Sequence, residues 1–113
     1  GTVIIAAQLS EGVGSHHFSG TLENWPDRQA LVAAMSAPDW VPIPEQWQPE
    51  MLARATRERR VIVVVPDDYP RAAMAACHVE VAKSVEEALE RVGGDGTIAV
   101  TPKGPYVTPF VVT

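Results

Sequence analysis

The sequence is poor in several features that would assign it to a specialised class of protein. Its single cysteine, Cys77, excludes an internal disulfide framework and a zinc site built from several thiols. Nine Lys and Arg against 14 Asp and Glu give a formal net charge of −5, which argues against a nucleic-acid surface. Apolar runs stay below the roughly 20 residues that a membrane span needs, and no signal peptide is visible. The 113 residues are predicted to form a single domain, residues 1–113.

An unbroken β-branched run at residues 61–65 predicts a strand covered on both faces. A helix is predicted directly before it. Pro49 has no N–H and therefore fits only the first turn of that helix, so Gln46 is the earliest N-cap and Trp47 the first helical residue. The residues predicted to form its inward face recur at helical spacing and are Met51, Leu52, Ala55 and Thr56.

Capping and turn signals predict the remaining elements. Helices are expected after Ser15, after Asp27 and after Ser84, which forms a capping box with Glu87. Further strands are expected at residues 3–7, 78–82, 97–101 and 106–112, the last confined to an edge by Pro109. The predicted fold class is a layered α/β domain with a mainly parallel sheet of four or five strands flanked by helices. A flavodoxin-like arrangement is the first choice, and a crotonase-like spiral is the alternative.

The loop after the first strand, SEGVGS at residues 10–15, is one candidate binding site. Gly12 and Gly14 permit backbone conformations closed to other residues, and Ser15 is a good N-cap. A glycine loop leading into a helix presents backbone N–H groups that suit an anion. The loop lacks the full dinucleotide fingerprint and a P-loop lysine, so a plain strand-to-helix turn explains it equally well.

Trp47 and Gln46 form the second candidate. In a β-α-β unit the helix N-terminus lies at the carboxyl edge of the sheet, where open α/β sheets bind their ligands. Trp47 is therefore an aromatic residue at a ligand edge. The alternative is that it only plugs the loop before the helix.

Other titratable residues have simpler explanations than catalysis. Adjacent His16 and His17 diverge by about 100 degrees on a helix and do not reach one metal together. Cys77 is expected to be a small buried apolar residue. Asp67 and Asp68 follow a strand at the ligand edge, where either a general base or a helix cap would sit. No catalytic residue and no metal ligand is identified.

Three segments, in the same order, resemble the C-terminal domain of the nickel-dependent lactate racemases and their relatives. They are TVIIAAQLSEGVGSHHF at residues 2–18, EQWQPEMLAR at residues 45–54 and TIAVTPKGPYVTPFVV at residues 97–112. The resemblance covers nearly the whole chain. It implies that the chain is an excised C-terminal domain of a larger two-domain enzyme, found in the bacterial cytoplasm.

The resemblance also implies a function. The parent would be a racemase or epimerase of small 2-hydroxy acids that uses a nickel-pincer nucleotide bound mainly by its N-terminal domain. That domain would be the partner of this chain, with no nucleic acid or membrane involved. This chain would act as lid and substrate wall, inactive alone, with Trp47 contacting substrate and Gln46 beside it.

The sequence departs from the family pattern at three positions. Glu45 stands where the family usually has Asp, Pro49 interrupts the usual run, and Lys103 replaces an acidic residue in the closing turn. These differences bear on substrate and subfamily, so lactate itself is not assumed. The rival hypothesis is a free-standing small-molecule or phosphate-binding α/β module that uses the glycine loop.

Overall fold

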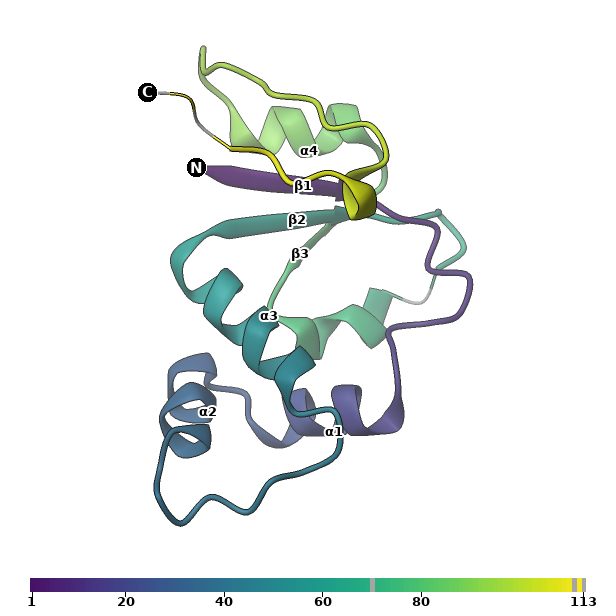
Figure 1. Cartoon of the computed structure of the whole chain (residues 1–113). Helices are drawn as coiled ribbons and strands as arrows, with labels where there is room; N and C mark the ends of the chain where they lie inside the picture. The colour runs from purple at the N-terminus through teal and green to yellow at the C-terminus, as the bar shows by residue number, and fades with distance from the viewer. Residues whose placement is uncertain (70, 111, 113) are drawn as a thin grey trace.

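A computed structural model describes residues 1–69, 71–110 and 112. Within them, three strands form one parallel sheet in the order β1-β2-β3, with β2 in the centre. The strands are β1 (Thr2–Ala6), β2 (Arg60–Val64) and β3 (Glu80–Ala82) (Figure 1). The predicted α/β class and parallel sheet are therefore confirmed. In a flavodoxin-like sheet the first strand is central, so the sequential order seen here differs from that arrangement.

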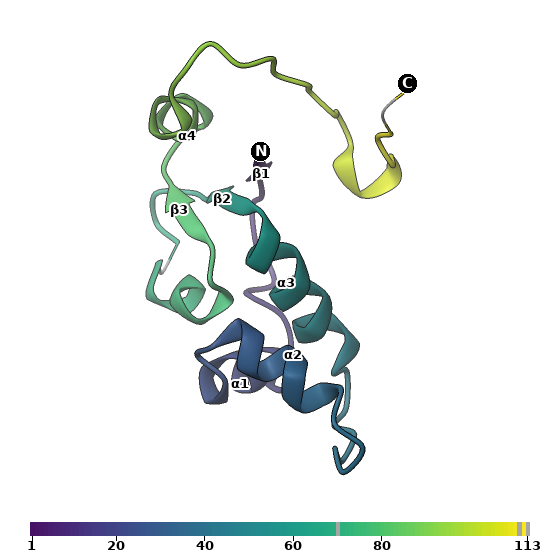
Figure 2. The same ribbon diagram turned by 90° about the vertical axis from the view of Figure 1, so that its left-hand side faces the viewer.

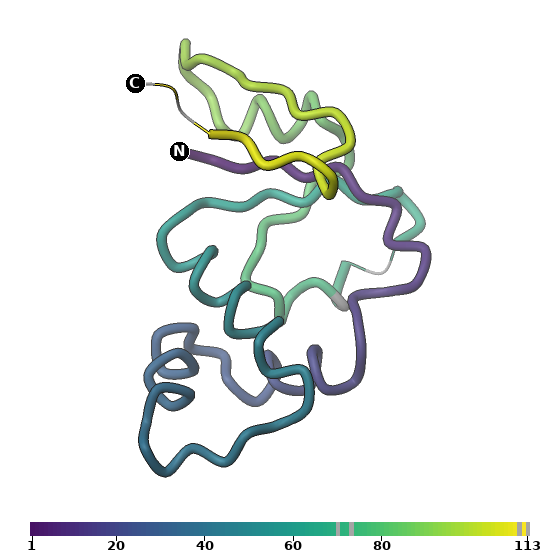
Figure 3. Tube along the Cα trace, viewed as in Figure 1, coloured from purple at the N-terminus to yellow at the C-terminus, as the bar shows by residue number. Residues whose placement is uncertain are grey.

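Helices cover the sheet on two sides (Figures 1 and 2). On one side lie α1 (His16–Asn24), α2 (Arg28–Met35), α3 (Trp47–Glu58) and the 3-10 helix η1 (Arg71–Cys77). Helix α4 (Val85–Val92) packs on the other side and contacts each of the three strands. A second 3-10 helix, η2 (Gly104–Tyr106), lies in the C-terminal segment, the yellow end of the trace in Figure 3. In the described part of the chain, no helix has the length and apolarity to cross a membrane.

Strand β2 forms the centre of the core because its side chains alternate between the two faces. Ile62 packs with Ala82 and Ala88 under α4, whereas Val63 and Val65 pack with Met74 of η1 on the opposite face. The prediction of a strand covered on both faces is thus confirmed. A third cluster joins the helices to one another and consists of Leu22, Leu31, Val32, Ala53 and Cys77.

The predicted helix starts are confirmed by their capping hydrogen bonds. Ser15 Oγ accepts from the backbone N–H of Phe18, and Asp27 caps α2. Ser84 Oγ accepts from the N–H of Glu87, whose own carboxylate accepts from the N–H of Lys83. This last bond, and a second from Arg91, hold the pKa of Glu87 below its usual value.

The predicted inward face of α3 was partly wrong. Leu52 and Thr56 do face the core, but Met51 is 60% exposed and Ala55 is also exposed. The buried stripe instead follows Pro49, Ala53 and Thr56. These positions are four and three residues apart and carry small or compact side chains, which let α3 approach α2 closely.

Two predicted strands are not strands in the structure. Residues 97–101 and 107–110 run beyond α4 without pairing to the sheet, and Figure 2 shows this segment leading away from the body of the domain. Ile98 is 64% exposed and Phe110 is 83% exposed. Val111, within the last predicted strand, lies outside the described residues. A β-branched sequence forms a strand only when another strand accepts its backbone hydrogen bonds, so the predicted count of four or five strands is not met here.

Candidate functional site

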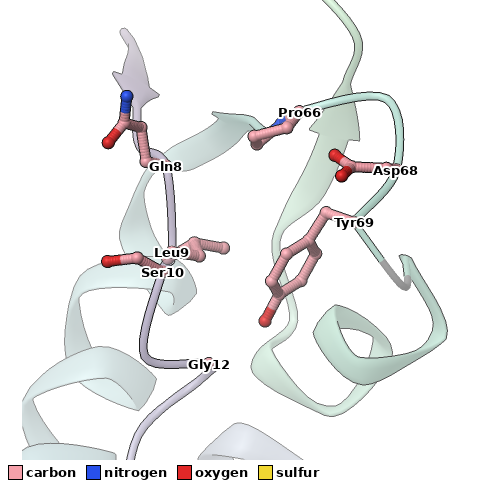
Figure 4. A pocket seen from close by; sticks show the side chains of 7 residues that line it. All are labelled: Gln8, Leu9, Ser10, Gly12, Pro66, Asp68 and Tyr69. Carbon is pink, nitrogen blue, oxygen red and sulfur yellow. The ribbon is translucent and has the colours of Figure 1, made fainter.

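The loops that follow β1 and β2 meet at the carboxyl edge of the sheet. Between them lies a hollow of about 500 Å³ that is open to solvent. Figure 4 shows the Asp68 carboxylate and the Tyr69 ring on one side of it, with the Leu9 side chain pointing toward them from the other. The lining residues are Gln8, Leu9, Ser10, Gly12, Pro66, Asp68 and Tyr69. This edge is where open α/β sheets bind small ligands.

Sequence reasoning identified only part of this hollow. Gly12 and Asp68 were candidates, whereas Gln8, Leu9 and Tyr69 were not. Each of the three follows a predicted strand within a few residues, and that position was the available signal. Leu9 also has a positive φ of 49°. A strained backbone of this kind is expensive for a non-glycine residue and is concentrated at functional sites.

Glycine is required in the loop at two positions. Gly12 has a φ of 84°, and its N–H donates to the Leu9 carbonyl at 2.9 Å, which closes the turn. Gly14 has a φ of 114°, and a Cβ atom there would lie 3.0 Å from Cδ1 of Phe18. The sequence-based expectation of unusual backbone conformations at these glycines is confirmed.

Ser15 connects this loop to the start of α3. Besides capping α1, its hydroxyl donates to the carboxylate of Glu45, thirty residues later in the chain. Two of the predicted candidate segments, residues 10–15 and the EQW tripeptide, are therefore held together. The carboxylate of Glu45 thus lies beside the first turn of α1, the position that the loop would offer to an external anion.

The start of α3 is held in place by Gln46. Its side-chain oxygen accepts from Trp40 Nε1 at 2.9 Å and from the backbone N–H of Ile43 at 3.1 Å. Gln46 is the N-cap residue by position, as predicted, but its side chain makes no capping hydrogen bond to α3. Trp40 in turn packs edge-on against Trp25, with ring centroids 6.1 Å apart. Gln46 thus anchors the connection that leads into the helix.

Trp47 follows immediately and is 65% exposed, in contrast to the other two tryptophans, which are half-buried and packed edge-on against each other. With this exposure it does not plug the preceding loop, in which Trp40 contacts Gln46 and Trp25. Trp47 lies at the first helical position, one residue after the clamped Gln46 and two after Glu45, whose positive φ of 58° is a further strained position. It is not among the residues lining the hollow of Figure 4.

The remaining titratable candidates are dispersed. His16 and His17 are exposed at the start of α1, and Asp67 lies at the surface 3.9 Å from Arg71. Cys77 is buried in the helical cluster as predicted, and desolvation raises the pKa of its thiol. Across residues 1–69, 71–110 and 112, no three His, Cys, Asp or Glu side chains lie together in a way that could hold a metal.

The structure is a small α/β domain with an open hollow at the carboxyl edge of its sheet and an exposed tryptophan at the start of α3. Residues 1–108 match the lactate racemase C-terminal domain family, and the chain belongs to that family. It is also 31% identical to a lactate racemase from Lactiplantibacillus plantarum, over 109 residues. That alignment covers 92% of this chain and 26% of the relative, so the chain spans about a quarter of the relative's length. No solved structure matches the chain significantly.

Proposed function

We propose that this chain is the lid and substrate-wall domain of a nickel-pincer-dependent racemase or epimerase of 2-hydroxy acids. The family match and the quarter-length coverage of a lactate racemase support a role as one part of a larger isomerase. The partner in this proposal is the N-terminal domain of the same protein, in the cytoplasm. In this proposal the nickel-pincer nucleotide and the reacting groups belong to the partner domain, and this chain supplies contacts to the substrate.

The observation that carries the proposal is that Trp47 is exposed directly after a residue, Gln46, whose side chain is hydrogen-bonded to the preceding segment. An isolated apolar side chain on a surface needs no explanation, but this one directly follows Gln46, whose side chain is hydrogen-bonded, and Glu45, whose φ is positive. A second surface placed against it would gain an apolar wall and an indole N–H donor. Such a wall excludes water from a substrate and helps to orient it.

The proposal is tested by substituting Trp47 in the full-length protein and measuring racemisation of small 2-hydroxy acids. Trp47→Ala is expected to lower kcat/KM by about tenfold or more, and Trp47→Phe by less, because the phenyl ring retains the apolar wall but not the N–H donor. Met51→Ala is the matched control, since Met51 lies one turn later on the same helix with similar exposure. Its kinetics are expected to remain unchanged.

Circular dichroism and urea titration of each variant separate a loss of activity from a loss of folding. If Trp47→Ala is folded and its kinetic constants equal those of the unsubstituted protein, Trp47 does not contact the substrate. Equal losses for Trp47→Ala and Met51→Ala would instead indicate a general disturbance of the α3 surface.

The second candidate, a free-standing module that binds phosphate in the glycine loop, is favoured by the positive φ angles of Gly12 and Gly14. The contact between Ser15 and Glu45 weighs against it, because a carboxylate of the chain already occupies the helix start. Calorimetric titration with phosphorylated metabolites tests this candidate. Binding that disappears in Gly14→Val but persists in Trp47→Ala would favour the module over the lid.

A further inference from the structure

Strand β1 leaves one edge of the sheet open. Among the described residues it pairs only with β2, so its other side offers backbone groups to a further strand. The N–H of Ala7, at the end of β1, donates to the Val64 carbonyl at 3.0 Å. Because successive residues of a strand point their backbone groups to opposite sides, the N–H groups of Ile4 and Ala6 point away from β2, toward the open edge.

The open edge lacks the features that protect the opposite edge of the sheet. Strand β3 is only three residues long, and its first residue, Glu80, accepts a hydrogen bond from Arg60 at 2.9 Å. Strand β1 is five residues long and contains neither a charged residue nor a proline. Its side chains Val3 and Ile5 are 46% and 45% exposed. Natural sheets shorten, charge or cover such an edge, so β1 is expected to have a cover.

The path of the chain determines where a strand that follows α4 belongs. Helices α1, α2, α3 and η1 lie on one face of the sheet and carry the chain from β1 to β2 and then to β3 (Figures 1 and 2). Helix α4 lies on the opposite face and contacts all three strands. Crossovers between parallel strands are right-handed in about 98% of cases. A right-handed crossover on the opposite face travels in the reverse direction, so a strand after α4 belongs beside β1 and not beyond β3.

Residues 97–101 have the sequence and the position that such a strand requires. Figure 1 shows the segment after α4 running in the same direction as β1, and Figure 2 shows it on the β1 side of the sheet, away from β3. Ile98 and Val100 are 64% and 81% exposed, and side chains two residues apart share one face of a strand. The segment is preceded by Gly-Gly-Asp-Gly at residues 93–96, whose first two residues have φ angles of 63° and 78°. Glycines change their backbone angles at little steric cost, so this linker can act as a hinge.

We propose that residues 97–101 form a strap that closes onto the open edge of β1 as a fourth, parallel strand. In this closed arrangement the N–H groups of Ile4 and Ala6 donate to carbonyl groups of the strap. The occupant of the edge is the chain's own segment, because a short flexible linker gives it an effective concentration on the order of millimolar, which a second copy does not match. The inference does not depend on the lid function, because Trp47 takes no part in the closure.

The test is backbone hydrogen exchange of the full-length protein, followed by mass spectrometry at single-residue resolution. The variant Ile98→Asp with Val100→Asp places two charges on the face of the strap that packs beside β1, and it should keep the strap open. Exchange at the amides of Ile4 and Ala6 is expected to be about tenfold faster in this variant than in the unsubstituted protein, the effect of losing one hydrogen bond at each amide. The amide of Ile5 points toward β2 and is the internal reference, with an unchanged rate.

The matched control is Val41→Asp, which places the same charge at a valine that is 77% exposed in the connection between α2 and α3. Its exchange rates at β1 are expected to equal those of the unsubstituted protein. Equal rates at Ile4 and Ala6 with and without the two strap substitutions would overturn the proposal, because the edge would then be open or covered by another part of the protein. Protection that increases with protein concentration would also overturn it, since the occupant would be a second copy.

A second pair of variants decides the question if the double substitution also accelerates exchange at Ile5, which indicates general unfolding. Ala99→Pro and Val100→Pro each remove one backbone N–H from the strap. These positions are adjacent, so one of the two N–H groups points toward β1 in a closed strap. At least one of these variants is expected to accelerate exchange at Ile4 and Ala6 with Ile5 unchanged. No change in either variant would overturn the proposal.

Discussion

Substitution of Ser15 by alanine tests the connection that joins the glycine loop to the start of α3. The Ser15 hydroxyl accepts from the Phe18 N–H at 3.2 Å and donates to Glu45. Loss of an N-cap side chain costs about 1 kcal/mol of unfolding free energy. The contact with Glu45 is exposed, so we assign it at most about 1 kcal/mol. Ser15→Ala is therefore expected to destabilise the domain by about 1–2 kcal/mol.

Equilibrium urea denaturation followed by far-UV circular dichroism measures this difference. Ser10→Ala is the control, since Ser10 is exposed in the same loop and points away from the hollow in Figure 4. It is expected to change the unfolding free energy by less than about 0.5 kcal/mol. An unchanged midpoint for Ser15→Ala would show that Ser15 does not cap α1 in solution.

A double-mutant cycle separates the two roles of the serine. If Ser15 and Glu45 are in contact, Ser15→Ala and Glu45→Ala together should destabilise less than the sum of the single variants, by about 0.5 kcal/mol or more. Strict additivity would mean that the two residues act independently, and the link between the loop and α3 would then be refuted even if the cap is real. In the full-length protein the same three variants should also lower turnover, because they loosen the segment that leads into Trp47.

Three further outcomes are expected. Leu31→Ala should lower the unfolding free energy by about 2–5 kcal/mol in urea titration, because Leu31 is fully buried in the helical cluster. Gly14→Ala should cost about 1–2 kcal/mol or more by thermal unfolding, since its φ is unfavourable for a residue with Cβ and the new atom meets Phe18. Stability should fall as the pH drops below about 4.3. A hydrogen bond from Arg60 holds the pKa of Glu80 in the folded state below its usual value. The stability that this ionised carboxylate contributes is therefore complete above the unfolded-state pKa and is lost as the pH falls through the folded-state pKa. Glu80→Gln should weaken this dependence of the unfolding free energy on acid pH.

Features that depend on neighbours in the sequence were predictable. The caps at Ser15 and Ser84 act on N–H groups three residues away, so a short motif contains the whole interaction. The central strand was equally predictable, because a strand buried on both sides carries an unbroken run of β-branched residues that is visible in the sequence. The segment at residues 97–101 carries a similar pattern, yet it is exposed and unpaired. Its composition is compatible with a strand, but pairing depends on a partner strand that the local sequence does not specify.

Contacts between distant segments were not predictable in the same way. The bond from Ser15 to Glu45 spans thirty residues and depends on how α1 and α3 pack. From the sequence we expected Gln46 to lie beside Trp47 in a substrate site. The sequence did not show that its amide oxygen accepts hydrogen bonds from Trp40 and Ile43.

At the start of α3 the residues on either side of the exposed Trp47 are anchored to the rest of the domain. Two residues after Trp47, the fully buried Pro49 anchors the first turn of α3 in the core. One residue before Trp47, Gln46 anchors the same turn through its hydrogen bonds to Trp40 and Ile43. A side chain that emerges between two such anchors loses little further freedom when a second surface closes over it. The backbone around Trp47 is therefore anchored, while its indole ring remains exposed and can contact a second surface. This arrangement suits the substrate wall that we propose, and for that reason we expect Trp47→Ala to affect turnover far more than folding.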